Sequence, residues 1–259
     1  MNRTSNPGGR AIGIDCGSTF CKGALFSGGR LQVLAIRPTG WDIASTGGLI
    51  LAELRAGRPD FQAEAPVVAT GYGREKIPAA RTITEITCHA RGAEYLFPGA
   101  RCVVDIGGQD YKVIETRGGK VISFQMNDKC AAGSGRFLEM VLGRLELDLE
   151  QMDELLALNR AITLNSTCVV FAESEIIGLL AQGALREEIL GGVVSSMATK
   201  IASQAARIGL ASPAVLTGGL ASSRGIGLAL SRSLGQVVEP VADGLYAGAI
   251  GAACLALEG

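Results

Sequence analysis

The chain has 259 residues, with 24 Lys and Arg against 25 Asp and Glu, and 47% of its residues are hydrophobic. This length suffices for one large or two small domains, and the hydrophobic content predicts a compact fold. The even charge balance offers neither the basic surface that binds nucleic acid nor a basic face for anionic membranes. We therefore expect no nucleic-acid partner and no membrane partner.

Neither the start of the chain nor its most apolar stretch predicts a secretory or membrane segment. The first ten residues are polar and rich in turn-forming types, and the apolar run Leu245–Leu257 has 13 residues. A run of that length is too short to span a bilayer and favours a buried helix. The seven cysteines are scattered, which favours free thiols in a reducing compartment. We expect a cytoplasmic protein.

Two stretches of the sequence follow the same plan of strand, Asp-x-Gly turn, strand, Gly-Gly turn and strand. The first predicts strands over 11–14, 21–26 and 31–36, followed by a helix over 43–56, a strand over 66–70 and a helix over 86–97. The second predicts strands over 102–106, 111–115 and 121–126, then helices from 133 onward with strands over 214–217 and 237–239. This repeat predicts a duplicated α/β protein.

Each Asp-x-Gly turn places an aspartate at the end of a buried strand and exposes backbone N–H groups after it. Glycine lets this backbone approach an anion, and Ser18 and Thr19 add hydroxyl donors. We predict that the two hairpins face each other and grip a polyphosphate, that Asp15 and Asp105 hold Mg²⁺ through water, and that Gln109 orients an attacking water. Asp105 and Gln109 are the predicted catalytic residues. The predicted nucleotide ligands are Asp15, Gly17, Ser18, Thr19, Lys22, Gly107, Gly108, Gln109, Gly133, Gly218 and Gly219.

A third glycine turn, Leu216-Thr217-Gly218-Gly219, ends another predicted strand. Ligands collect at the carboxyl ends of strands, so this turn suits an adenosine pocket. The alternative is that each turn is an ordinary hairpin with a structural aspartate, which two copies in register make less favoured. The glycine loop over Thr70–Arg74 is interpreted as a simple turn or as part of a partner-docking face.

This arrangement resembles the superfamily of acetate and sugar kinases, heat-shock chaperone ATPases and actin. The resemblance implies an α/β fold of two duplicated RNase H-like domains hinged over ATP. We place the first domain at residues 11–97, joined by a C-terminal helix over 245–258, and the second at residues 98–244. Because that fold serves kinases, chaperones and filaments alike, it does not define the function.

Two cysteines in the predicted second domain precede helices. Cys130 lies just before a helix expected to begin near Gly133, and Cys168 lies at the start of a helix that Asn165, Ser166 and Thr167 can cap. Helix N-termini favour thiolates and bound anions, and a thiolate-ligated iron–sulfur cluster is such an anion. A [4Fe-4S] cluster usually needs four thiolates, so two per chain suggest that a two-fold dimer completes the set. Two structural thiols are the alternative.

The remaining cysteines have simpler explanations. Cys88, Cys102 and Cys254 lie in apolar contexts, where a free cysteine behaves as a small hydrophobic residue. Cys16 and Cys21 flank the first Asp-x-Gly turn, and core packing is favoured over chemistry there too. The single histidine, His89, is assigned to packing or capping.

Several strings resemble the activators of 2-hydroxyacyl-CoA dehydratases and the related ATPase subunits of benzoyl-CoA reductase. They are IGIDCGST, ATGYGREKI, ITCHARGAEYLFPGA, VVDIGGQDYKVI, FQMNDKCAAGSGRFLE, STCVVFAESEIIGLL, VLTGGLAS and YAGAIGAA. The resemblance runs from about Ala11 to Ala256. The strings NDKCAAGSGRF and STCVVFAESE are specific to this family and absent from ordinary sugar kinases.

The resemblance implies a homodimer with one [4Fe-4S] cluster, ligated by Cys130 and Cys168 of each subunit, and Mg-ATP in each subunit. It implies that a ferredoxin or flavodoxin supplies an electron and that ATP hydrolysis drives its transfer to a partner dehydratase or reductase. The helix that starts after Cys130 is expected to run toward the nucleotide and to couple the two sites. No feature of the sequence identifies the acyl-CoA substrate of the partner.

Two other functions stay open at this point. A small-molecule kinase of the same superfold would use Asp105 as a general base and would need no iron. A nucleotide-dependent scaffold or filament protein would self-associate without redox chemistry. The cysteine helices favour the electron activator, because a kinase has no use for two thiols at helix starts.

Overall fold

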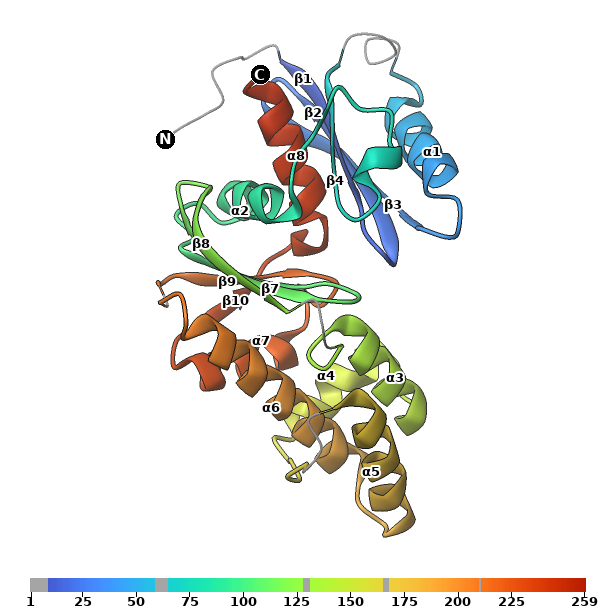
Figure 1. Cartoon of the computed structure of the whole chain (residues 1–259), viewed down its shortest axis with the longest axis vertical. Coiled ribbons are helices and arrows are strands. Elements are labelled where there is room, and N and C mark those ends of the chain that lie inside the picture. The colour runs from blue at the N-terminus through green and yellow to red at the C-terminus, as the bar shows by residue number, and fades with distance from the viewer. Residues whose placement is uncertain (1–8, 59–64, 128–130, 165–167, 210) are drawn as a thin grey trace. The chain divides into compact units, whose positions relative to one another are not determined.

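The computed structural model describes residues 9–58, 65–127, 131–164, 168–209 and 211–259 (Figure 1). The chain forms two compact units. Unit 1 is built from the described residues up to Ala100, together with Thr116–Ile122 and Ala242–Gly259. Unit 2 is built from the described residues of Arg101–Glu115 and Ser123–Val241. The domain boundaries drawn from the sequence stay a prediction.

Unit 1 contains a five-stranded sheet of order β3-β2-β1-β4-β5, in which β1 runs antiparallel to β2 and parallel to β4. Its strands are β1 (Arg10–Cys16), β2 (Phe20–Ser27), β3 (Arg30–Pro38), β4 (Val67–Thr70) and β5 (Arg81–Thr82). Its helices are α1 (Ile43–Arg55), α2 (Glu85–Leu96) and α8 (Ala247–Leu257), with short 3-10 turns at Arg74–Lys76 and Gly244–Tyr246.

The two faces of this sheet are covered by different helices. An added Cβ at Gly13 of β1 would lie 2.0 Å from the backbone oxygen of Ala249, so α8 packs directly on the backbone of β1. On the other face, an added Cβ at Gly23 of β2 would lie 2.6 Å from the side chain of Ile50 in α1. Because side chains alternate along a strand, Asp15 shares the α8 face with Gly13.

The helix α8 is composed mainly of alanine and glycine, which explains its close approach to the sheet. The buried helix expected over 245–257 is therefore present, although it begins at Ala247 after a 3-10 turn. Among the described helices, none combines the length and the apolar character that crossing a membrane requires.

Unit 2 repeats the sheet of unit 1, with strand order β10-β9-β6-β7-β8. The strands of this sheet are β6 (Cys102–Ile106), β7 (Tyr111–Arg117), β8 (Lys120–Asn127), β9 (Ala214–Gly218) and β10 (Val238–Pro240). The adjoining ends of β7 and β8, within Thr116–Ile122, are grouped with unit 1. Its helices are α3 (Gly135–Leu145), α4 (Leu149–Ala157), α5 (Val169–Ala181), α6 (Arg186–Ala205) and α7 (Arg224–Leu234). One apolar core joins β6, β7 and β9 to all five helices.

The strand order confirms the predicted duplication, with β1, β2 and β4 of unit 1 corresponding to β6, β7 and β9 of unit 2. Two element boundaries differ from the prediction in ways that concern the site. Strand β1 continues to Cys16, so both cysteines that flank the first turn lie within paired strands. Helix α3 begins at Gly135 rather than near Gly133, because Gly133 has a φ of +108°, which is incompatible with an α-helix.

Candidate functional site

The first Asp-x-Gly motif forms a two-residue hairpin loop, here called the β1–β2 turn (Gly17–Phe20). The backbone N–H of Gly17 donates to the carbonyl oxygen of Phe20 at 3.0 Å, which leaves Ser18 and Thr19 as the loop residues. The hydroxyl of Thr39 donates to the carbonyl oxygen of Gly17 at 2.8 Å and fixes the turn. Thr19 Oγ1 is buried and makes no hydrogen bond within the described residues, so it is an unsatisfied polar group beside the turn.

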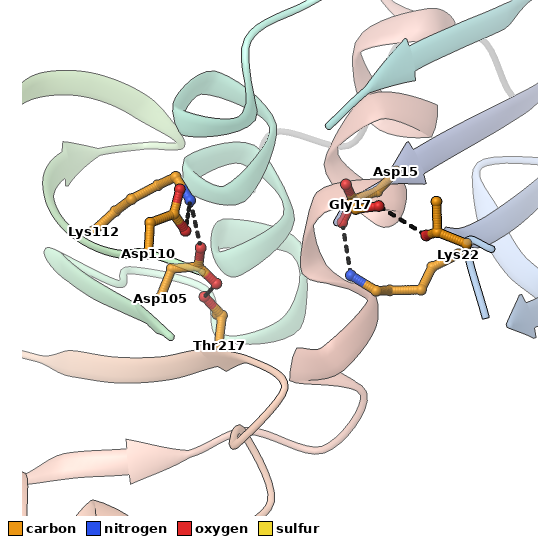
Figure 2. Close-up of polar contacts among 8 residues, drawn as sticks. Asp15, Gly17, Lys22, Asp105, Asp110, Lys112 and Thr217 are labelled. Atoms are coloured by element: carbon orange, nitrogen blue, oxygen red, sulfur yellow. Dashed lines mark hydrogen bonds and ion pairs between the residues drawn. The ribbon is translucent and has the colours of Figure 1, made fainter. Parts of the chain in front are cut away.

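Asp15 and Lys22 are directly opposite each other in the β1–β2 register, and Lys22 Nζ lies 3.1 Å from Asp15 Oδ2 (Figure 2). The sequence predicts Lys22 as a nucleotide ligand, and in the structure its ammonium forms an ion pair with Asp15. An added Cβ at Gly248 of α8 would lie 2.6 Å from Asp15 Oδ2 and 3.0 Å from Nε2 of the buried His89. His89 therefore packs beside the aspartate, as part of the surroundings of the turn.

The second Asp-x-Gly motif forms an equivalent loop, here called the β6–β7 turn (Gly107–Asp110). The backbone N–H of Gly107 donates to the carbonyl oxygen of Asp110 at 2.9 Å, and Gln109 is exposed at the tip. Asp105 is buried, and its register partner Lys112 places Nζ 3.4 Å from Asp105 Oδ2 and 2.8 Å from Asp110 Oδ1 (Figure 2). One buried ammonium is thus shared by two carboxylates, an arrangement that the sequence did not predict.

The third glycine turn, which contains Thr217, Gly218 and Gly219, contacts Asp105. Thr217 Oγ1 donates to Asp105 Oδ1 at 3.1 Å, and the N–H of Gly219 donates to the carbonyl oxygen of Ile106 at 2.9 Å. Gly218 has a φ of +87°, and an added Cβ would lie 2.3 Å from that same oxygen. Glycine is required here because both the backbone conformation and the contact exclude a side chain. Asp105, Gly218 and Gly219 are therefore brought together within unit 2.

Unit 1 contains a second copy of this Thr-Gly pair, which sequence reasoning missed. Thr70 is the parallel register partner of Asp15, as Thr217 is of Asp105. Gly71 has a φ of +91°, and an added Cβ would lie 2.7 Å from Asp15 Oδ1. The signal was present in the sequence, because Thr-Gly follows a buried strand in both units.

The start of α3 is bonded to the β6–β7 turn. The backbone N–H of Gly135 donates to the carbonyl oxygen of Gly107 at 2.8 Å, and that of Arg136 donates to Gly108 at 2.8 Å. The N-cap residue Ser134 makes no side-chain cap hydrogen bond. The turn therefore accepts two of the N–H groups that a helix start otherwise leaves without partners.

Gly133, a predicted nucleotide ligand, packs behind the same turn. An added Cβ there would lie 2.7 Å from the ring of Tyr111, the first residue of β7. The segment that leads into α3 is thereby held against β7 as well as against the turn carbonyls.

The predicted cluster cysteines are described in part. Cys168 is exposed at the N-cap of α5 and makes no side-chain cap hydrogen bond, while Cys130 and the polar residues 165–167 lie outside the described residues. Among the side chains that the structure describes, no group of three or more His, Cys, Asp or Glu residues is placed to hold a metal ion. An exposed thiol at a helix start fits one ligand of a cluster shared between chains.

Helices α3 and α5, which follow the two cysteines in sequence, are joined by an ion pair. Arg144 Nε donates to Glu173 Oε1 at 2.8 Å. Glu173 is thus engaged in a bond within unit 2.

The buried cysteines divide into single thiols and one pair. Burial raises the pKa of Cys88, Cys102 and Cys254 to about 12 each, as expected for packed, unreactive thiols. Cys16 and Cys21 are hydrogen-bonded to each other, and this bond lowers the pKa of Cys16 and raises the pKa of Cys21.

The two sheets have one strand order and each has an Asp/Lys hairpin turn, which makes a duplicated α/β fold that sugar kinases share. A ROK family glucokinase from Streptomyces griseus, solved with glucose and AMPPNP, has a TM-score of 0.59 over 97% of this chain and 100% of that chain. At 16% identity this likeness shows the fold alone.

The sequence profile of the BadF/BadG/BcrA/BcrD ATPase family matches residues 12–256. The chain therefore belongs to that family and is an ATPase.

Similar proteins include the (R)-2-hydroxyglutaryl-CoA dehydratase activating ATPase of Acidaminococcus fermentans, 37% identical over 95% of this chain and 96% of that protein. The activator of lactoyl-CoA dehydratase of Anaerotignum propionicum is 39% identical over 95% of this chain and 97% of that protein. The crystal structure of component A of the Acidaminococcus fermentans dehydratase has a TM-score of 0.88 at 36% identity, covering 96% of this chain and 98% of that chain. The activator of the 2-hydroxyisocaproyl-CoA dehydratase from Clostridium difficile, with bound ADPNP, has a TM-score of 0.84 at 34% identity, covering 96% and 94%.

Proposed function

We propose that this protein is an ATP-dependent electron activator of an acyl-CoA dehydratase or reductase. Two copies of the chain would hold one [4Fe-4S] cluster through Cys130 and Cys168 of each, and each copy would bind Mg-ATP. The similarity to dehydratase-activating ATPases over nearly the whole chain supports this assignment. A ferredoxin or flavodoxin is the proposed electron donor.

The observation that carries the proposal is the pair of hydrogen bonds between the β6–β7 turn and the start of α3. Gly135 and Arg136, which donate these bonds, follow Cys130 by a few residues. A change in the turn when a nucleotide binds or is hydrolysed must move these N–H groups or break their bonds. The helix that follows Cys130 in the sequence is thus bonded to the proposed nucleotide-binding turn, an arrangement that an ordinary kinase would not require.

The residues of each turn fit a phosphate and a hydrated magnesium ion. The loop N–H groups of Ser18 and Thr19, and of Gly108 and Gln109, are the backbone donors that anions bind. Asp15 and Asp105 are each held by a lysine in register, which fixes the carboxylates for water-mediated contact with the metal. Gln109, exposed at its loop tip, is free to orient a water molecule.

Cys130 and Cys168 are the residues that would hold the redox centre. When bound, the cluster accepts and releases one electron at low potential. Cys168 at the N-cap of α5 would ligate it, and the first N–H groups of α5 would stabilise its negative charge. The Arg144–Glu173 ion pair would hold α5 against α3, so that both helices move together.

The test is anaerobic purification followed by iron and sulfide analysis. The proposal expects about four irons per dimer, with loss of iron in Cys130→Ala and Cys168→Ala and retention in the buried control Cys102→Ala. Asp105→Ala is expected to keep the iron and lose ATPase activity. An iron-free dimer with normal ATPase activity, or equal iron in all of these cysteine variants, would contradict the proposal.

The kinase alternative is less well supported. Asp105 would be its general base, but the similarity over nearly the whole chain is to dehydratase-activating ATPases, whereas the likeness to a glucokinase is at 16% identity. Phosphorylation of glucose by the iron-free protein would restore the kinase assignment.

A further inference from the structure

The thiols of Cys16 and Cys21 form a pair that the proposed function does not use. They are direct partners in the antiparallel register of β1 and β2 and are both fully buried. Both are free thiols, and their side chains are hydrogen-bonded to each other. Two sulfurs held side by side at the base of a two-residue turn are positioned to form a bond.

The register places this pair at a position where strands approach most closely. The bond from the Gly17 N–H to the Phe20 oxygen makes these two residues a hydrogen-bonded pair. Such pairs alternate with non-hydrogen-bonded ones, so the next pair, Cys16 and Cys21, is non-hydrogen-bonded. Non-hydrogen-bonded partners have Cα atoms about 4.5 Å apart, at the short end of the range of about 4.4–6.8 Å that disulfides span. A disulfide can form here, and it would be strained and easily reduced.

We propose that Cys16 and Cys21 are a reversible redox site, which hydrogen peroxide converts to a disulfide that weakens nucleotide binding at the β1–β2 turn. One thiol attacks a peroxide oxygen, the O–O bond breaks, and a sulfenic acid and one water form. The second thiol attacks that sulfur and releases a second water. The two thiols lose two electrons and two protons, and the peroxide is reduced to two waters.

The expected effect follows from the opposite faces of β1. Cys16 and Cys21 pack with Ile50 and Leu54 of α1, whereas Asp15 faces Gly248 of α8. A disulfide therefore leaves the carboxylate in place and acts on the turn itself. Disulfides favour Cα separations of about 5.5–6 Å, so the new bond spreads the strands beside the turn and displaces its N–H groups.

The neighbouring glycine loop would respond as well. The N–H of Gly73 donates to the carbonyl oxygen of Cys16 at 2.8 Å, and an added Cβ at Gly71 would lie 2.5 Å from that oxygen. Spreading of β1 and β2 thus shifts the loop after β4. Peroxide is small, and the pair lies one residue from the half-buried turn, so local opening of the hairpin gives it access.

Unit 2 provides an internal control for this inference. The residues that correspond to Cys16 and Cys21 are Ile106 and Tyr111, which face each other in the same register position of β6 and β7. Peroxide can therefore modify the β1–β2 turn and not its counterpart. The effect on nucleotide binding rests on the proposed role of the β1–β2 turn, whereas formation of the disulfide does not.

The test is peptide mapping of the full-length protein after treatment with hydrogen peroxide and alkylation of the remaining thiols. We expect one peptide joining Cys16 to Cys21, absent in Cys16→Ser and Cys21→Ser and present in the control Cys102→Ser. If the serine variants fail to fold, mapping of the unmodified chain still decides the outcome. Alkylation of both thiols after exhaustive oxidation, or their joining to other cysteines, would overturn the proposal.

The consequence is measured by titration with a fluorescent ADP analogue. Oxidised protein is expected to bind it about tenfold more weakly, and a thiol reductant is expected to restore the affinity. Any loss caused by damage to the metal centre would persist after reduction and would also occur in Cys16→Ser. A mapped disulfide with unchanged affinity would contradict the role of the turn in nucleotide binding and leave the redox site in place.

Discussion

The β1–β2 and β6–β7 turns have the same plan, but different parts of the molecule hold them. In unit 1 the carbonyl oxygen of Gly17 accepts from the hydroxyl of Thr39, which follows β3 of the same sheet. In unit 2 the equivalent oxygen of Gly107 accepts from the N–H of Gly135 in α3. The first turn is therefore fixed to its own sheet, and the second is bonded to the helix that follows Cys130. We infer that both turns bind nucleotide and that a nucleotide-dependent change in the β6–β7 turn is transmitted to helix α3.

The lysines beside the two turns also differ, in their burial and in the number of carboxylates that they contact. Lys22 pairs with Asp15 and is partly accessible, whereas Lys112 is buried between Asp105 and Asp110. The difference arises at the last turn position, where unit 1 has the exposed Phe20 and unit 2 has Asp110. The second carboxylate, Asp110, adds an ion pair that ties the β6–β7 turn to Lys112.

The largest expected effect concerns these lysines. Lys112→Met leaves two carboxylates without their shared cation and is expected to lower the free energy of unfolding by about 3–5 kcal/mol. Lys22→Met removes a single, partly exposed pair and is expected to lower it by about 1.5–3 kcal/mol. Urea unfolding of both variants in the same buffer measures the difference. Equal losses would show that the second carboxylate contributes nothing.

A smaller effect is expected at the two Thr-Gly pairs. Gly218→Ala and Gly71→Ala each force a side chain into the left-handed region, at about 1–2 kcal/mol, and against a backbone oxygen at 2.3 Å and 2.5 Å respectively. Both variants should lose stability and bind ADP more weakly. Gly143→Ala is a suitable control because an added Cβ there meets no atom within 4 Å. Normal ADP affinity in Gly71→Ala would show that the Thr-Gly pair of unit 1 does not share the role of the pair in unit 2.

The smallest expected effect tests how the first turn is fixed. Thr39→Val removes the hydroxyl that donates to Gly17 at 2.8 Å and should lower the free energy of unfolding by about 1 kcal/mol. Because this bond lies within unit 1, the variant should weaken ADP binding without changing electron transfer per ATP hydrolysed. A change in that ratio, measured with the electron donor and a one-electron dye acceptor, would show that the first turn also transmits the signal.

The sequence predicts much of the fold because its signals are local. Strand alternation, Gly-Gly turns and the repeated Asp-x-Gly motif located both sheets, and Cys168 was placed at the helix start where the structure has it. The seven-residue spacing from Asp15 to Lys22 recurs from Asp105 to Lys112. It becomes an ion pair only because each loop has two residues, and sequence reasoning had not fixed that register.

The features that the sequence did not predict depend on contacts between distant segments. The Gly135–Gly107 bond joins a helix start to a turn, and the Arg144–Glu173 pair joins two helices. Neither has a periodic or compositional signal along the chain. The pairing of Cys16 with Cys21 was likewise hidden, because the predicted strand ended at Ile14 and left Cys16 in the turn.

The central claim is that nucleotide binding at the β6–β7 turn is transmitted to helix α3, which follows Cys130. Its most direct test is hydrogen exchange of the backbone amides at the start of α3, measured with and without Mg-ADP. We predict that nucleotide slows exchange of the amides of Gly135 and Arg136. Gly135→Pro removes the first of these two donors and is expected to abolish the response of the remaining Arg136 amide, while Gly143→Ala keeps both responses. Unchanged exchange at the start of α3 in a protein whose β6–β7 turn is protected by nucleotide would contradict the account.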